Sequence, residues 1–139
     1  MTKDGTGTLS IFTTNDYTGP VLVKAGVLIV TNGTALGSSS SAATVQSGAA
    51  LQTSGTLAIS KHLVLNGSGI VGAGALRQTA NSRTWSGAIT LGSSGVRINA
   101  DANTLTLTGG ISGSGNPDLV IGGGGNITVN TVPINIGSG

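Results

Sequence analysis

A short alternation of apolar and polar residues is the feature that most limits how this chain can fold. Aliphatic residues recur in pairs separated by one residue, with Thr, Ser, Ala or Asn between or beside them. Successive side chains of a β-strand point to opposite faces, so this spacing predicts short, half-buried strands. The pairs are Leu9 and Ile11, Leu28 and Val30, Leu57 and Ile59, Leu63 and Leu65, Ile89 and Leu91, Val96 and Ile98, Leu105 and Leu107, Leu119 and Ile121, Ile127 and Val129, and Ile134 and Ile136.

The strands are separated by turn-forming residues and resemble one another. Gly, Ser and Asn cluster at 31–34, 37–41, 92–95 and 122–125. Segments that begin at Gly7, Gly26, Gly55 and Gly125 share a glycine followed by aliphatic residues two and four positions later. A fifth begins at Asn103, a residue that also tolerates positive φ. Self-similar short strands with such turns indicate a solenoid.

The core of this chain must be thin, because large side chains are almost absent. The 139 residues include one Phe, one Tyr, one Trp, one Met and no Cys. One turn of a solenoid holds too few aliphatic residues to offset the conformational entropy of ordering it. Stacked turns can fold because each gains ladder hydrogen bonds and contacts from its neighbours. We therefore expect an all-β solenoid of about six to seven turns in preference to a two-sheet sandwich, as a single segment over residues 1–139.

Residues 1–58 resemble a known repeat. The matching stretches are 5–11 (GTGTLSI), 15–19 (NDYTG) and 23–28 (VKAGVL), continued by 35–37 and 45–51. This pattern is similar to the autotransporter-associated β-strand repeat, also called the passenger-associated transport repeat. A weaker match covers about 59–111, centred on 84–91 and 105–109. The resemblance implies a right-handed parallel β-helix in a large bacterial surface or secreted passenger protein, in which the repeat is structural and carries no catalytic residues.

Several motifs suggest chemistry but lack the residues that it requires. Gly67, Gly69 and Gly72 have the spacing of a dinucleotide-binding turn, yet neither a helical pattern nor a suitably placed acid follows them. We interpret them as a glycine-lined corner. Glycines 122–125 suggest a calcium-binding repeat without its Asp, and Asp101 with Asn103 supplies too few oxygens for calcium. We predict no metal, no cofactor and no catalytic residue.

Two aromatic residues, Trp85 and Tyr17, could face a ligand, although packing is the favoured role because both lie within the repeat pattern. His62 is the only histidine, and with Lys61 it is expected to cap a solvent-facing edge. Alternating threonines at 104, 106 and 108 fit either an ice-binding face or an ordinary solvated strand, and the second is favoured. The six Lys and Arg are scattered, which argues against nucleic-acid binding.

Three functions remain open from the sequence. The favoured one is a noncatalytic stalk or scaffold, displayed outside a bacterial cell as part of an adhesin-like passenger. The second is a module that binds a glycan or a host protein on one face, and the third is a polysaccharide lyase or hydrolase, which the scattered acids make the least favoured. The partners expected are neighbouring turns of a longer parent chain and head-to-tail copies of this one.

The residues predicted to point inward are Leu9, Ile11, Leu28, Val30, Leu57, Ile59, Leu105 and Leu107, and Leu57→Asp is expected to unfold the protein.

Overall fold

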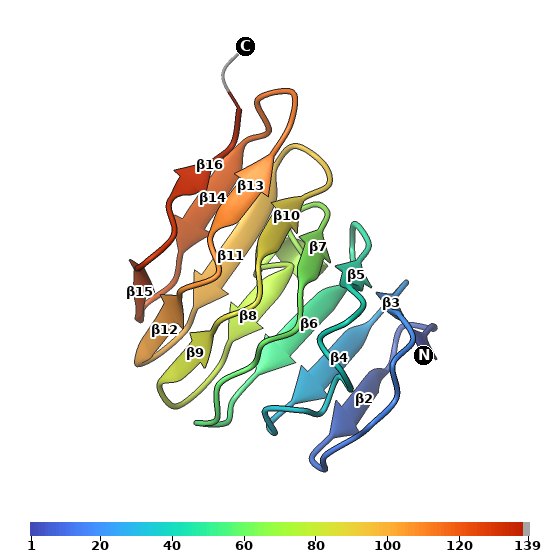
Figure 1. The fold of residues 1–139 in the computed structure, drawn as a ribbon. Coiled ribbons are helices and arrows are strands. Elements are labelled where there is room, and N and C mark those ends of the chain that lie inside the picture. Colours follow the sequence, from blue (N-terminus) through green and yellow to red (C-terminus); the bar gives the residue numbers. More distant parts are fainter. Residues whose placement is uncertain (138–139) are drawn as a thin grey trace.

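The computed structural model describes residues 1–137, which form an all-β solenoid (Figure 1). Every strand pairs in parallel with its equivalent in the next turn, and about six turns stack along one axis. The solenoid fold and its parallel pairing are therefore confirmed, at the lower end of the expected number of turns. The handedness and the extension of this single unit to residue 139 stay predictions, since residues 138–139 lie outside the described part.

Three parallel sheets form the sides of the solenoid. Sheet A contains β1 (Thr2–Lys3), β3 (Val21–Val23), β5 (Ala43–Val45), β7 (Leu63–Leu65), β10 (Ile89–Leu91), β13 (Ile111–Gly113) and β16 (Ile134–Asn135). Sheet B contains β2 (Thr8–Ile11), β4 (Val27–Val30), β6 (Ala50–Thr53), β8 (Leu76–Gln78), β11 (Val96–Ala100) and β14 (Leu119–Gly122). Sheet C contains β9 (Arg83–Trp85), β12 (Thr104–Leu107) and β15 (Asn126–Val129). The helical content of residues 1–137 is one 3-10 turn, η1 (Ile70–Gly72), so no helix in this range could span a membrane.

A continuous column of aliphatic side chains runs through the solenoid along sheet B. Its members lie in register on six successive strands, and those between the two ends are fully buried. The column is Leu9, Leu28, Leu51, Leu76, Ile98 and Ile121. Each inward residue therefore contacts its equivalents above and below, which is how turns too small to fold alone stabilise one another.

The neighbouring inward column of sheet B changes from apolar to polar. Ile11 and Val30 are followed in register by Thr53 and Gln78, and then by Ala100. Thr53 and Gln78 have no exposed surface, and Thr53 Oγ1 and Gln78 Oε1 have no hydrogen-bond partner within the described residues. Buried polar atoms without partners destabilise a fold, so this is the weaker part of the core.

The prediction that Leu57 points inward is wrong. Leu57 is 55% exposed, and the segment forms no strand but only an isolated bridge from Ile59 to Trp85. The interior there is filled by Arg83, whose Nη2 donates to Thr31 O (2.6 Å) and whose Nε donates to Gly55 O (2.9 Å). Gly55 makes room for this group, because a Cβ at that position would overlap Thr31 O and Arg83 Nη2. Arg83 therefore occupies the space that the sequence pattern assigns to Leu57.

The other predicted inward residues are mostly confirmed. Leu28, Val30, Ile59, Leu105 and Leu107 are buried. Ile11 is half-buried against the core, whereas Leu9 lies in the inward column but is 37% exposed because it belongs to the first turn.

The self-similar segments divide between two sheets. Those at Gly7 and Gly26 lie side by side in sheet B, and those at Asn103 and Gly125 lie side by side in sheet C. Their irregular spacing in the sequence follows from this division. Asn103 has φ of 60°, so Asn does stand at a position with left-handed backbone, as expected.

Candidate functional surfaces

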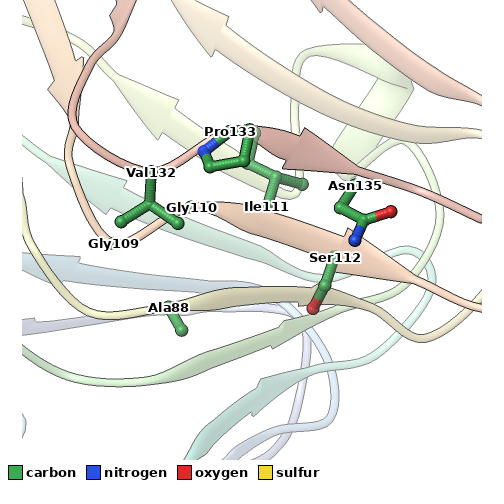
Figure 2. Close-up of a pocket in the computed structure, with 8 residues that line it drawn as sticks. All are labelled: Ala88, Gly109, Gly110, Ile111, Ser112, Val132, Pro133 and Asn135. Carbon is green, nitrogen blue, oxygen red and sulfur yellow. The ribbon is translucent and has the colours of Figure 1, made fainter.

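The outer face of sheet A has a shallow hollow of about 230 Å³ near the last turns (Figure 2). The hollow forms because two small residues, Ala88 and Gly110, occupy neighbouring positions in successive turns and leave space above the strands. Val132 and Pro133 border one part of the hollow, and Ser112 and Asn135 lie toward the other (Figure 2). Its lining contains no titratable side chain, so this hollow offers packing and hydrogen bonds but no acid–base chemistry.

A network of four polar side chains lies on the outer face of sheet B, on β8 and at β11. Arg77 on β8 contacts Asp101 in the next turn through Nε (2.8 Å to Oδ2) and Nη2 (2.6 Å to Oδ2). Asn99 Nδ2 donates to Asp101 Oδ1 (2.7 Å), and Asn99 Oδ1 accepts from Arg97 Nη2 (2.8 Å). Asn99 is only 7% exposed. These hydrogen bonds orient two guanidinium groups along one face.

The charge of Asp101 is stabilised by this network. The hydrogen bond from Arg77 is the largest influence, with further contributions from the charge of Arg77 and from Asn99, and together they lower the pKa of Asp101 below its ordinary value of 3.8 despite some desolvation. Asp101 therefore remains a carboxylate at neutral pH.

A groove of about 180 Å³ adjoins the network. It lies between sheet B and the knuckle, the name used here for the projecting segment 66–74. The residues that line it are Val27, Ala50, Gln52, Ile70, Val71, Ala73, Gly74 and Arg77. Apolar walls with an amide and a guanidinium at one edge are suited to a small polar ligand with an apolar face.

The glycine motif forms the knuckle and not a nucleotide site, as interpreted from the sequence. Gly67, Gly69 and Gly72 all have positive φ, of 68°, 80° and 71°. The turn that they bracket is the short η1, which is too brief to offer the helix N-terminus that holds a pyrophosphate. Val71 at its tip has φ of 50° and is 98% exposed.

Trp85 is a core residue in this structure. It has no exposed surface, and its Nε1 donates to Lys61 O (2.8 Å). An indole without exposed surface has none to offer a ligand, so burial corrects the idea of a ligand-facing Trp85 and agrees with the packing role. Tyr17 is half-buried and donates its hydroxyl to Ala35 O (3.2 Å), and burial raises the pKa of this hydroxyl.

The expectation that Lys61 caps a solvent-facing edge is wrong. Lys61 is 2% exposed, and its Nζ donates to Ser38 O (2.6 Å) and Ser41 Oγ (3.2 Å) in the preceding turn. Burial lowers the pKa of Lys61. Its neighbour His62 is exposed, with Nε2 at 3.2 Å from Thr90 Oγ1.

Buried cations are bonded to backbone carbonyl groups in this solenoid. Lys3 Nζ donates to the carbonyl oxygens of Asp4, Gly5 and Ala25, and Arg83 makes the similar contacts described above. Burial lowers the pKa of Arg83 to about 10. These side chains join successive turns at their corners, and the sequence pattern gives no signal for them.

The acidic residues bind different partners. Asp4 Oδ2 pairs with Lys24 Nζ (3.3 Å), Asp101 pairs with Arg77, and Asp118 Oδ2 accepts from Ser94 Oγ (3.1 Å). No group of three His, Cys, Asp or Glu residues that could hold a metal occurs within residues 1–137. Asp101 and Asn103 are thus part of an ion pair and a turn in the structure.

The alternating threonines extend into an uncharged array on sheet C. Thr106 lies in register between Thr84 and Thr128, and Thr104 lies beside Asn126. These side chains are half-buried or exposed. They form the outer, solvated side of strands whose inner side is apolar, which agrees with the favoured interpretation.

The outer network on sheet B is not among the features that the sequence predicts. Arg97, Asn99 and Asp101 alternate along the chain and so point to one face, a pattern of polar residues that could have been found. The position of Arg77 beside Asn99 depends on the strand register, which the sequence does not provide.

Comparison with known proteins supports the expected repeat. The family model Passenger-associated-transport-repeat matches residues 1–30, which is the part that contains β1 to β4. Neither the curated proteins nor the solved structures contain a significant match to the chain. The match covers less of the chain than the resemblance to residue 58 and the weaker pattern at 59–111, and these extensions stay predictions. Residues 1–30 are therefore similar to a passenger-associated transport repeat, and they form the first turns of a β-solenoid.

Proposed function

We propose that this chain is a noncatalytic structural segment, a stalk or scaffold, of a bacterial surface-exposed or secreted autotransporter-like passenger or adhesin. The repeat at residues 1–30 supports the assignment to an autotransporter passenger region. The observation that carries the structural role is the unbroken inward column from Leu9 to Ile121, which links all the turns of sheet B in register.

Parallel stacking gives this role a simple physical basis. Each added turn lengthens the solenoid by about 4.8 Å and repeats the same ladder and column contacts. Further turns of a longer parent chain would extend the same columns. A functional group carried beyond the solenoid would then be held at a fixed distance from the cell surface.

Protease treatment of intact bacteria that express the parent protein tests the display outside the cell. We expect antibodies against residues 1–137 to label intact cells and protease to remove this labelling. Labelling that appears only after the cells are lysed would contradict the proposal.

Incubation of the purified chain with acidic polysaccharides tests the noncatalytic role, since any turnover that is lost in Asp101→Asn would contradict it.

A second candidate function is glycan binding on the outer face of sheet B. The hydrogen-bonded Arg97–Asn99–Asp101–Arg77 network and the adjoining groove support it, because guanidinium and amide groups bind sugar hydroxyls and carboxylates and the apolar wall suits a sugar ring. Trp85 is buried, so Arg97→Gln is the more informative variant for this test.

A glycan array separates the two candidates. The binding module predicts a signal for the wild type that is lost in Arg97→Gln and kept in Lys24→Gln. Lys24 is the control because it is an exposed lysine that pairs with Asp4 and does not belong to the network. A scaffold without a binding site predicts no signal from any of the three proteins.

A further inference from the structure

Three segments of the chain match the pattern at which a sugar can be attached to asparagine, which is Asn followed by any residue except Pro and then by Ser or Thr. They are 32–34 (NGT), 66–68 (NGS) and 126–128 (NIT). The pattern alone does not distinguish between them. The structure does, because it gives the three asparagine side chains different surroundings.

Asn32 lies at the corner that follows β4, and its side chain is folded back on its own backbone. Asn32 Oδ1 accepts from Thr34 N (3.1 Å) and from Thr34 Oγ1 (3.4 Å). This arrangement is an Asx-turn. The two donors fix which side of the amide is oxygen, so the other side is Nδ2, and this nitrogen makes no hydrogen bond to any residue within 1–137. The nitrogen that would receive a sugar is therefore available.

The corner is accessible and has a turn of the solenoid on either side. Thr34 is exposed and Asn32 is half-buried. Asn15 N, in the preceding turn, donates to Thr34 O (3.2 Å). In the following turn, Ala58 lies against Gly33, where an added Cβ would be 2.6 Å from Ala58 O. Further turns of a longer chain would therefore leave this corner exposed.

Asn66 joins neighbouring turns and is a poor acceptor in the folded protein. Its Nδ2 donates to Val45 O (2.9 Å) in the preceding turn. Its Oδ1 is directed toward the following turn, where a Cβ added to Gly92 would be 2.5 Å away. A sugar on Nδ2 would break the contact with Val45 and would need space between the turns.

Asn126 is the first residue of β15 and has an extended backbone. Residues two positions apart in a strand are separated by about 6.6 Å, and the structure gives no hydrogen bond between the side chains of Asn126 and Thr128 in the part of the chain that it describes. Asn126 N donates to Asn103 O (2.7 Å) in the ladder. The segment would have to leave this ladder to form the turn that Asn32 already has.

We propose that Asn32 is a glycosylation site, to which a glycosyltransferase attaches a sugar from an activated sugar phosphate. A bond forms between Asn32 Nδ2 and C1 of the sugar. The bond from C1 to the phosphate oxygen breaks, and the phosphate leaves with the electron pair. A base of the transferase takes one proton from Nδ2. The two donors to Oδ1 favour this step, because they stabilise the negative charge that develops on the amide.

A sugar at this corner would protect the solenoid surface. Leu57 is 55% exposed, and its Cβ lies 3.5 Å from the position of a Cβ added to Gly33. An attached sugar would cover part of this apolar side chain. It would also shield an exposed turn, which is the kind of segment that proteases cut first. The proposal concerns one corner and does not depend on either candidate function.

Mass spectrometry of the parent protein, isolated from the bacteria that produce it, tests the proposal. Trypsin cleaves after Lys and Arg, so the peptides 25–61, 62–77 and the one that begins at Ile98 each contain one of the three asparagines. We expect peptide 25–61 to carry the added mass of a sugar and fragment ions to place it on Asn32. Peptide 62–77 should be unmodified.

Two variants at position 34 form a matched pair. Thr34→Ser keeps the hydroxyl group and should keep the sugar, whereas Thr34→Val keeps the shape of the side chain without the hydroxyl and should lose it. Asn32→Gln should also lose it. Because Thr34 is exposed, these variants should remain folded, and circular dichroism of each purified protein checks this.

Four results would overturn the proposal. The first is an unmodified peptide 25–61 in the wild type, and the second is a sugar found on its serine or threonine residues but not on Asn32. The third is a sugar on Asn32 that persists in Thr34→Val. The fourth is equal modification of peptide 62–77, because that result shows that the pattern alone, and not the Asx-turn, selects the acceptor.

Discussion

Arg83 on β9 lies in register with Leu105 on β12, so a guanidinium and an isobutyl group hold the same inward position in neighbouring turns. Both side chains are buried. Leu105 is stabilised by apolar contact, whereas Arg83 is stabilised by donating to the carbonyl oxygens of Thr31 and Gly55. The same inward position can therefore hold either an apolar side chain or a cation that donates to backbone carbonyl groups.

Arg83→Ala should strongly destabilise the protein. The change leaves a cavity and removes the donors to two inward carbonyl groups, so we expect a loss of about 3–5 kcal/mol in the free energy of unfolding. Arg77→Ala is the matched control. The Arg77 side chain is 32% exposed in its ion pair, so its loss should cost about 1 kcal/mol or less. Urea denaturation of both variants measures the difference, and equal losses would show that Arg83 is not a structural link between turns.

Leu57→Asp should leave the protein folded, in contrast to the expectation from the sequence. Leu57 is 55% exposed, so the change should cost about 0.5 kcal/mol or less. Ile59→Asp, two residues later and 1% exposed, should unfold the protein because it buries a carboxylate in the core. Thermal melting followed by circular dichroism distinguishes the two variants. Unfolding by Leu57→Asp would contradict this structure and support the sequence prediction that Leu57 points inward.

Val71→Asn should stabilise the protein. Val71 has φ of 50°, which is unfavourable for a β-branched residue and tolerated by Asn, and its 98% exposure means that few contacts are lost. We expect a gain of about 1 kcal/mol, seen as a higher melting temperature. Val120→Asn, at an exposed valine within a strand, should give no such gain.

Asp101 should make stability depend on pH in the acid range. Its pKa is lowered in the folded state below the ordinary value of 3.8, so its contribution is fully present above 3.8 and is lost as pH falls through the lower folded pKa. Because the pair is partly exposed, we expect this contribution to be about 1 kcal/mol or less. Asp101→Asn and Arg77→Gln should both reduce the loss of stability in acid, measured by urea denaturation at pH 7 and in steps below pH 4. An unchanged acid limb in both variants would contradict the assignment.

The sequence predicts the solenoid because strand periodicity and small aliphatic residues leave few other ways to bury apolar surface. It identifies most strands whose inward residues are both aliphatic, such as Leu63 and Leu65 on β7, but it misses β3, where Val21 and Val23 are both buried. It misses β8 and β9, whose inward residues include Gln78 and Arg83, because polar residues at inward positions break the pattern.

The candidate surfaces could be predicted only in part. The sequence predicts the glycine corner, since local turn chemistry determines it. The network on sheet B depends on contacts between turns about two dozen residues apart, such as Arg77 with Asp101, and only the strand register brings these side chains together. Likewise, nothing local distinguishes the buried Lys61 from an exposed lysine.

The hydrogen bonds of Arg83 have a consequence for how the chain acquires its structure. Thr31, Gly55 and Arg83 belong to three successive turns, so a nascent chain that ends before residue 83 lacks the side chain that ties them together. The first turns should therefore gain protection from hydrogen exchange in one cooperative step once the fourth has been added. Assembly of this region would then proceed in a block and not one turn at a time.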